Sequence, residues 1–237
     1  MNIVLLTAED FFAPGKVQLR DRRFQHIRTV LAAQPGQQLK VGLLNGNLGK
    51  GIVTRLNTQD VELDVALETT PPPPTPISLL LALPRPKALR RILQSTTALG
   101  IKQIILINSY RVEKSYWQSP FLQAKALEEQ LCLGLEQAAD TLLPEVLLRP
   151  RFKPFVEDEL PALTNQTHCL LADPYTATAC PANCTNPTWL AVGPEGGFIP
   201  YETECLEHAG FQKVQLGSRI LRVETAVSAL LGRLLPA

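Results

Sequence analysis

Two loops of this sequence carry residues whose types and spacing could bind a ligand. The first is Gly193-Pro194-Glu195-Gly196-Gly197-Phe198, which follows the apolar run Thr188–Val192. Glycine tolerates positive φ and lets the backbone approach a ligand closely, so free N–H and C=O groups here could read the edge of a planar base. A Gly-Gly segment by itself is more often a tight turn between a strand and a helix.

The second loop is residues 216–226, Leu-Gly-Ser-Arg-Ile-Leu-Arg-Val-Glu-Thr-Ala. Leu216, Ile220 and Leu221 could form an apolar shelf for a planar base. Arg222 and Glu224 could form an ion pair or act as catalytic groups. Charged residues at the start of a helix are also typical of a solvated cap, so this loop alone does not decide between the two interpretations.

Alternating strand and helix patterns fill the part of the chain that holds both loops. Apolar runs predict strands at 77–83, 103–108, 145–148, 168–172, 188–192 and 213–216. Helical patterns, four of which open at a proline, predict helices at 86–99, 120–139, 154–160, 200–209 and 224–235. This alternation predicts an α/β fold with a parallel sheet. Both loops then lie at the carboxyl ends of strands, where such sheets bind ligands.

A proline-rich segment at residues 69–76 separates this region from a shorter one. Proline fixes φ and lacks an amide hydrogen, so the segment is predicted to be a semi-rigid linker. The residues before it predict strands at 38–44, 51–56 and 61–67, a hairpin turn at Asn45-Gly46-Asn47 and a helix at 22–33. We therefore predict a small barrel or curled sheet at 1–68, the linker at 69–76 and an α/β domain at 77–237.

Composition narrows the classes of function. The 237 residues carry a formal net charge of +1, so only local basic clusters, at residues 20–28 and 85–91, point to nucleic acid. The sequence has no cationic start, so no secretory signal is predicted. No apolar run is long enough to predict a membrane-spanning helix. The five irregularly spaced cysteines are typical of reduced thiols in a cytoplasm and fit no common zinc pattern. The absence of Walker-type and Gly-x-Gly-x-x-Gly motifs disfavours ATP and nicotinamide chemistry.

Together the two loops resemble the signature of the SPOUT superfamily, the knotted S-adenosylmethionine methyltransferases. The resemblance is strongest to the RsmE-type 16S rRNA (uracil-N3) methyltransferases, which end in a GPEGG-F loop, a helix, AGF, a short strand and LG-x-RILR-x-ETA. Here these stand in order at 193–198, 209–211 and 216–226. Weaker similarity extends over nearly the whole chain.

The resemblance implies a C-terminal domain with a deep trefoil knot, preceded by a PUA-like β-barrel that binds RNA. It implies S-adenosyl-L-methionine as cofactor, ribosomal RNA of the small-subunit particle as partner, and a cytoplasmic homodimer, with no metal and no membrane. The positions that match the family's cofactor site are Leu171, Ala172, Val192, Gly193, Pro194, Glu195, Gly196, Gly197, Leu216, Gly217, Ile220, Leu221 and Thr225.

Catalysis is assigned by the same resemblance to Arg222 and Glu224. The permanent positive charge of Arg222 suits the negative charge that develops on uracil as N3 loses its proton, and Glu224 could orient Arg222. The basic clusters and the resemblance suggest RNA contacts, although a solvated face is the alternative. The predicted contacts are Arg22, Arg23, His26, Arg28, Arg85, Lys87, Arg90 and Arg111.

Some positions depart from the family pattern. Ala32 and Asp140 stand where the family commonly has arginine, Ala98 where it has glutamate, and Asn2-Ile3 where an N-terminal arginine is usual. These positions lie away from the cofactor loops, in places that could touch RNA. Two alternatives therefore stay open: the same cofactor domain acting on another RNA or base, and an RNA-binding relative without catalysis.

Overall fold

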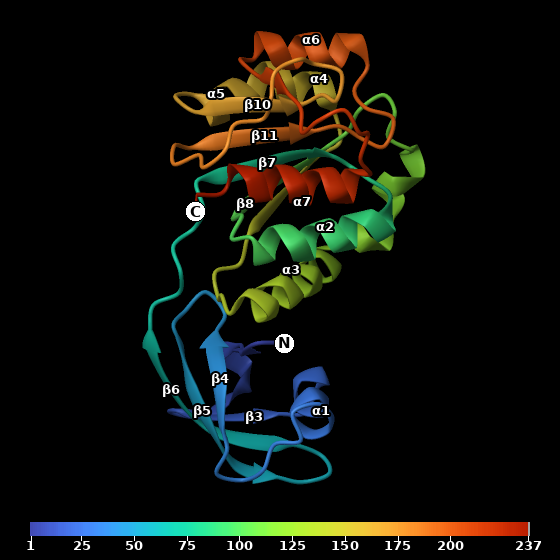
Figure 1. Cartoon of the computed structure of the whole chain (residues 1–237). Helices are drawn as coiled ribbons and strands as arrows, with labels where there is room; N and C mark the ends of the chain where they lie inside the picture. Colours follow the sequence, from blue (N-terminus) through green and yellow to red (C-terminus); the bar gives the residue numbers. More distant parts are fainter. Residues whose placement is uncertain (237) are drawn as a thin grey trace. The chain divides into compact units, whose positions relative to one another are not determined.

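The computed structural model describes residues 1–236 as two compact units, each built around a six-stranded sheet (Figure 1). Unit 1 comprises Met1–Pro73 together with Cys132–Leu143, and unit 2 comprises Pro74–Leu131 and the chain from Pro144 onward. The first boundary, after Pro73, falls within the proline-rich segment. Sequence patterns gave no indication that residues 132–143 belong with the N-terminal unit.

The sheet of unit 1 has the order β1-β4-β5-β6-β3-β2. β1 pairs in parallel with β4, and all the other neighbours are antiparallel. Its strands are β1 (Val4–Leu6), β2 (Phe11–Ala13), β3 (Lys16–Leu19), β4 (Gln38–Leu43), β5 (Leu48–Leu56) and β6 (Val61–Thr69). The predicted hairpin turn joins β4 to β5, with Asn45 at a φ of 57°. A short 3₁₀ turn, η1 (Ala8–Asp10), follows β1.

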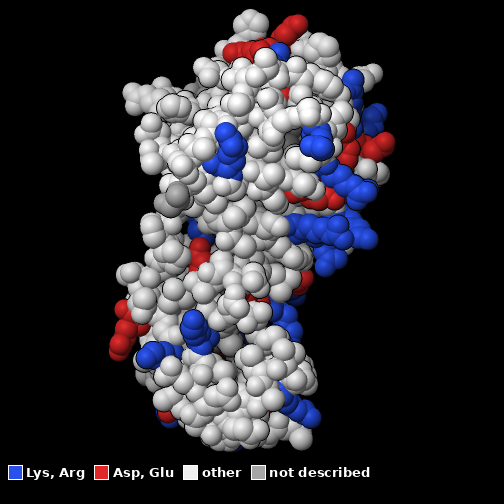
Figure 2. Space-filling view, in the orientation of Figure 1, with Lys and Arg blue, Asp and Glu red and all other residues white. Residues whose placement is uncertain are grey.

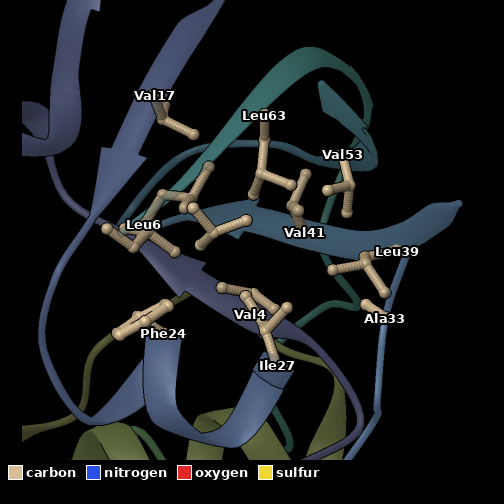
Figure 3. Close-up of a cluster of buried hydrophobic side chains, with 12 residues drawn as sticks. Val4, Leu6, Val17, Phe24, Ile27, Ala33, Leu39, Val41, Val53 and Leu63 are labelled. Atoms are coloured by element: carbon tan, nitrogen blue, oxygen red, sulfur yellow. The ribbon is translucent and has the colours of Figure 1, made fainter. Parts of the chain in front are cut away.

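The core of unit 1 lies between this curled sheet and helix α1 (Arg22–Thr29). Figure 3 shows Phe24 and Ile27 of α1 directed toward Val4 and Leu6 of β1. The helix ends before the predicted residue 33, and Ala32 has a left-handed φ of 47°.

The opposite face of β1 is also buried. Ile3 and Leu5 pack with Leu135, which comes from the 132–143 segment. Because both faces of β1 are covered, its sequence shows no alternation of apolar and polar residues, and the sequence analysis missed this strand.

The sheet of unit 2 is entirely parallel, as predicted, with the order β12-β10-β11-β7-β8-β9. Its strands are β7 (Ile77–Ala82), β8 (Gln103–Ile107), β9 (Glu145–Arg149), β10 (His168–Ala172), β11 (Thr188–Val192) and β12 (Gln212–Val214). Each predicted strand of this region is present, with ends shifted by a few residues. Because all six run the same way, the loops after them gather at one edge of the sheet.

Helices cover the sheet of unit 2, and Figure 1 shows α2 and α7 side by side along one face. The longer helices of unit 2 are α2 (Pro86–Ala98), α6 (Pro200–His208) and α7 (Val223–Leu234). Helix α3 (Ala124–Ala138) begins in unit 2, and its residues from Cys132 onward belong to unit 1. Shorter turns are η2 (Lys114–Gln118), η3 (Pro120–Leu122), α4 (Phe152–Pro154), the π-helical η4 (Phe155–Glu159) and α5 (Leu160–Thr164). Within residues 1–236, no helix is long and apolar enough to cross a membrane.

Candidate active site

A pocket of about 280 Å³ lies at the carboxyl ends of β10, β11 and β12 in unit 2. It is enclosed chiefly by the loops that follow these three strands. Its lining residues are Arg111, Leu171, Ala172, Asp173, Pro174, Tyr175, Val192, Gly193, Pro194, Glu195, Gly196, Gly197, Phe198, Thr203, Val214, Gln215, Leu216, Gly217, Arg219, Ile220, Leu221, Val223, Ala226 and Leu230.

The loop after β11, residues 193–198, is shaped by its glycines. Gly197 has a φ of 73°, which favours glycine, and its N–H donates to the Pro194 carbonyl at 2.8 Å. A Cβ on Gly193 would lie 3.1 Å from the backbone nitrogen of Phe198, and one on Gly196 would lie 2.9 Å from Cδ of Arg111. Larger residues would therefore distort this wall of the pocket.

The loop after β12 presents apolar side chains and a second glycine bend. Gly217 has a φ of 131°, and its N–H donates to the side-chain carbonyl of Gln215. Leu216, Ile220 and Leu221 are 37%, 71% and 38% exposed, and all three line the pocket. The expected apolar shelf is therefore available to a planar ligand.

The structure gathers the predicted cofactor positions around this pocket, except for Thr225, which is exposed on α7 outside the lining. The sequence analysis did not include several lining residues: Asp173, Pro174, Tyr175, Phe198, Thr203 and Gln215. Residues 173–175 directly follow a predicted strand, so the rule that ligands bind at carboxyl ends of strands could have found them.

The predicted catalytic residues lie at the start of α7, beside the pocket. Arg222 is the exposed N-cap residue of this helix. Glu224, whose side chain is 16% exposed, lies 3.8 Å from an Arg85 nitrogen. Within residues 1–236, Arg222 and Glu224 form no ion pair, and Arg85 is the basic partner of Glu224.

Arg85 connects two loops of the site. Besides approaching Glu224, its Nε lies 3.9 Å from Glu195, and its backbone N–H donates to the same carboxylate at 3.2 Å. The half-exposed side chain of Arg85 stands between the carboxylates of the 193–198 loop and of α7. The predicted contact of Arg85 with RNA stays a prediction.

Two of the arginines predicted to bind RNA are held by carboxylates within unit 1. Arg22 donates through both terminal nitrogens, each at 2.8 Å, to Glu136, which is 2% exposed. Arg23 is itself only 11% exposed and donates to both oxygens of Asp10, at 2.6 and 2.7 Å. Burial lowers the pKa of Arg23, but its hydrogen bonds to Asp10 and Asp21 outweigh this and raise the pKa. Arg23 is therefore a structural residue, and the expectation that it contacts RNA is corrected.

The remaining predicted RNA residues have more accessible positions. In unit 1, Arg28 is exposed and donates to the Thr58 carbonyl at 3.2 Å, while His26 is half-buried. In unit 2, Lys87 is exposed and Arg90 stacks 5.2 Å above the ring centre of Phe121. Arg111 is also exposed and lines the pocket, so it lies beside the candidate cofactor site. Figure 2 shows Lys and Arg side chains gathered on unit 2 near the beginning of α2.

Asp140, one of the departures from the family pattern, caps the chain after α3. Its side chain is 3% exposed and accepts the N–H groups of Thr141 at 2.6 Å and Leu142 at 3.0 Å. Its carboxylate therefore binds backbone N–H groups of unit 1 and is buried, so it adds no charge to the surface. Among residues 1–236, no cluster of three or more His, Cys, Asp or Glu side chains could hold a metal ion.

Comparison with known proteins gives consistent matches over the whole chain. A family model described as an RNA methyltransferase domain matches residues 71–235. Ribosomal RNA small subunit methyltransferase E of Treponema pallidum is 33% identical over 236 residues, covering 97% of this chain and 88% of that protein. Ribosomal RNA small subunit methyltransferase E 1 of Borreliella burgdorferi is 24% identical, and the match covers 97% of this chain and 95% of that protein.

Solved structures share the fold. A crystal structure of ribosomal RNA small subunit methyltransferase E from Neisseria gonorrhoeae, bound to S-adenosyl methionine, has a TM-score of 0.75 and 24% identity. The match covers 97% of this chain and 95% of that one. A probable rRNA-methyltransferase from Porphyromonas gingivalis has a TM-score of 0.71 and 21% identity, with 97% and 95% covered.

Proposed function

This chain belongs to the RNA methyltransferase family that includes ribosomal RNA small subunit methyltransferase E, and we propose that it methylates N3 of a uridine in small-subunit (16S) ribosomal RNA, with S-adenosylmethionine as the methyl donor. The observation that carries the proposal is the pocket at the carboxyl ends of β10, β11 and β12. It combines the two sequence loops that resemble the family's signature with an enclosed wall of glycine backbone.

The residues of the pocket fit this cofactor. The glycine backbone at 193–197 leaves room that a Cβ would fill, and its polar groups can read an adenine edge. Leu216, Ile220 and Leu221 offer apolar surface to a planar ring. The proposed cofactor residues are the predicted positions that line the pocket, together with Thr225, which is exposed and lies outside the lining.

When bound, S-adenosylmethionine supplies an activated methyl group. The task of the chain is then to hold an unpaired uracil, since N3 lies on the edge used for base pairing, and to stabilise the charge left as its proton departs. Arg222, exposed beside the pocket, is suited to that charge. Glu224 acts with Arg85 to fix the start of α7. The proposed RNA contacts are the predicted basic residues whose side chains are at least partly accessible: Arg22, His26, Arg28, Arg85, Lys87, Arg90 and Arg111.

Finer features of the fold form part of the proposal. We assign a PUA-like barrel to unit 1 and a trefoil knot to unit 2. The knot is proposed from the sequence resemblance. Backbone N–H groups of Asn183 and Cys184 donate to the carbonyls of Arg233 and Leu234, at 3.2 and 2.7 Å, and so hold the 173–187 loop against the C-terminal end of α7, a contact that a knot would also contain.

The active form is proposed to be a cytoplasmic homodimer. Exposed Ile220 and Leu221 at the rim of the pocket are apolar surface that a second copy could cover. Light scattering should give twice the chain mass, and a monomer at assay concentration would contradict this part of the proposal.

Methyl transfer from labelled S-adenosylmethionine tests the function. Purified protein should label small-subunit particles from a strain that lacks the enzyme, and should leave tRNA from the same strain unlabelled. Label in tRNA alone would show that tRNA, and not ribosomal RNA, is the substrate. Cofactor binding without label in either RNA would indicate an RNA-binding relative without catalysis. Gly196→Trp, which fills the pocket wall, should abolish cofactor binding in calorimetry while Gly232→Ala, on open α7 surface, should not.

A further inference from the structure

Glu202, on the first turn of α6, is a buried carboxylate that joins two distant parts of the chain. It is 3% exposed. One of its oxygens accepts the backbone N–H of Tyr110 at 2.6 Å, and the other accepts that of Ile199 at 3.0 Å. Tyr110 follows β8, whereas Ile199 comes directly after the 193–198 loop of the pocket. A single side chain therefore ties the segment after β8 to the end of that loop.

A second connection links the same two segments. The guanidinium of Arg111, the residue after Tyr110, donates to the carbonyl of Gly196. The aliphatic part of Arg111 also packs where a Cβ of residue 196 would stand, and Arg111 lines the pocket. The position of Tyr110 thus determines where Arg111 supports the glycine loop.

We propose that Glu202 is a positioning residue for the cofactor pocket. It holds the backbone of Tyr110 and Ile199 so that Arg111 and the 193–198 loop keep the spacing that the cofactor requires. Glu202 does not itself line the pocket, so it acts through these neighbours. The inference rests on the proposed function for the identity of the cofactor, but the bracing of the loop can be measured without any ligand.

The carboxylate is chemically specific for this role. Both of its oxygens accept, and both partners are backbone donors that are fixed in direction. Glutamine has the same shape but replaces one acceptor by an NH₂ donor, which would face a backbone N–H at close range. Glu202→Gln therefore removes one of the two connections without emptying the space, which makes it the informative substitution.

The test compares Glu202→Gln with Glu204→Gln, the same change at an exposed position of the same helix. Glu202→Gln should raise the dissociation constant for S-adenosylmethionine about tenfold or more, without RNA present, as expected for loss of a hydrogen bond to a charged group. Amide hydrogen exchange at residues 196–198 should be faster in the ligand-free variant. Glu204→Gln should match the wild type in both measurements.

The outcomes separate the inference from the function on which it rests. If the melting temperature falls but exchange and affinity are unchanged, Glu202 is merely structural and the proposal is overturned. Faster exchange with unchanged affinity would also overturn it. If the wild type binds no cofactor, the proposed function fails, and exchange alone still decides whether Glu202 braces the loop. Should Glu202→Gln fail to fold, Glu202→Asp, which keeps the carboxylate but shortens its reach to Tyr110 and Ile199, must speed exchange at residues 196–198 and weaken cofactor binding for the proposal to stand.

Discussion

Replacing Arg23 by methionine should destabilise unit 1. The guanidinium donates to both oxygens of Asp10, at 2.6 and 2.7 Å, and to the carbonyl of Leu5 at 2.7 Å. The side chains of Arg23 and Asp10 are 11% and 10% exposed. Methionine replaces the aliphatic stem but leaves a buried carboxylate and a buried carbonyl without this donor.

The size of the effect follows from these contacts. Removing one partner of a buried ion pair costs roughly 3–5 kcal/mol. Asp10 keeps the N–H of Thr7 as a donor at 2.7 Å, so we expect a loss at the lower end, about 3 kcal/mol. For a unit of this size, that loss lowers the melting temperature by roughly 12–24 °C.

The assay must observe unit 1 itself. Both tryptophans, Trp117 and Trp189, lie in unit 2, so their fluorescence reports the wrong part of the chain. Amide hydrogen exchange in β4–β6 reports unit 1 directly and converts to a free energy of opening. Circular dichroism then gives the melting temperature of the whole chain.

Arg28→Met is the matched control, because Arg28 is exposed on the same helix and donates to the Thr58 carbonyl at 3.2 Å. It should change stability by no more than about 0.5 kcal/mol. The double variant Asp10→Leu, Arg23→Met removes both charges and should recover part of the loss. If Arg23→Met is as stable as Arg28→Met, the assignment of Arg23 as a structural residue is refuted.

Further predictions concern both units. Gly49→Ala should destabilise unit 1 by about 1–3 kcal/mol, since its Cβ would lie 1.8 Å from the Ala66 carbonyl oxygen; exchange in β5 equal to wild type would contradict this. Burial raises the pKa of Cys180 to about 11, so its thiol stays neutral as pH rises to 9, and mass spectrometry should find iodoacetamide on Cys184 well before Cys180. Arg222→Ala should lower turnover more than it weakens cofactor binding; unchanged turnover would remove Arg222 from catalysis.

The α/β unit could be predicted from sequence because its signals are local. Each buried parallel strand is a short apolar run, and prolines mark the starts of α2 and α6. Because ligands bind at the carboxyl ends of parallel strands, the two loops that line the pocket could be predicted from sequence. The sequence predicts a helix at 120–139, but the observed helix α3 begins at Ala124, because residues 120–122 form a separate 3₁₀ turn.

The features that were missed depend on contacts between residues far apart in sequence. β1 needs residues 132–143 to cover its second face, which no local pattern reveals. Arg22 and Arg23 form a basic cluster in sequence, but their carboxylate partners, Glu136 and Asp10, appear only after folding. Glu202 likewise looked like an ordinary residue of a helix, because its partner Tyr110 is 92 positions away.

The most direct test of the central claim is the identity of the methylated nucleoside. Small-subunit particles labelled by the purified protein and S-adenosylmethionine would be digested to nucleosides and analysed by mass spectrometry against synthetic standards. We predict that the label appears as 3-methyluridine and is lost with Gly196→Trp. Label in another nucleoside, or 3-methyluridine that persists when the 193–198 loop is blocked, would contradict the assignment of function to this pocket.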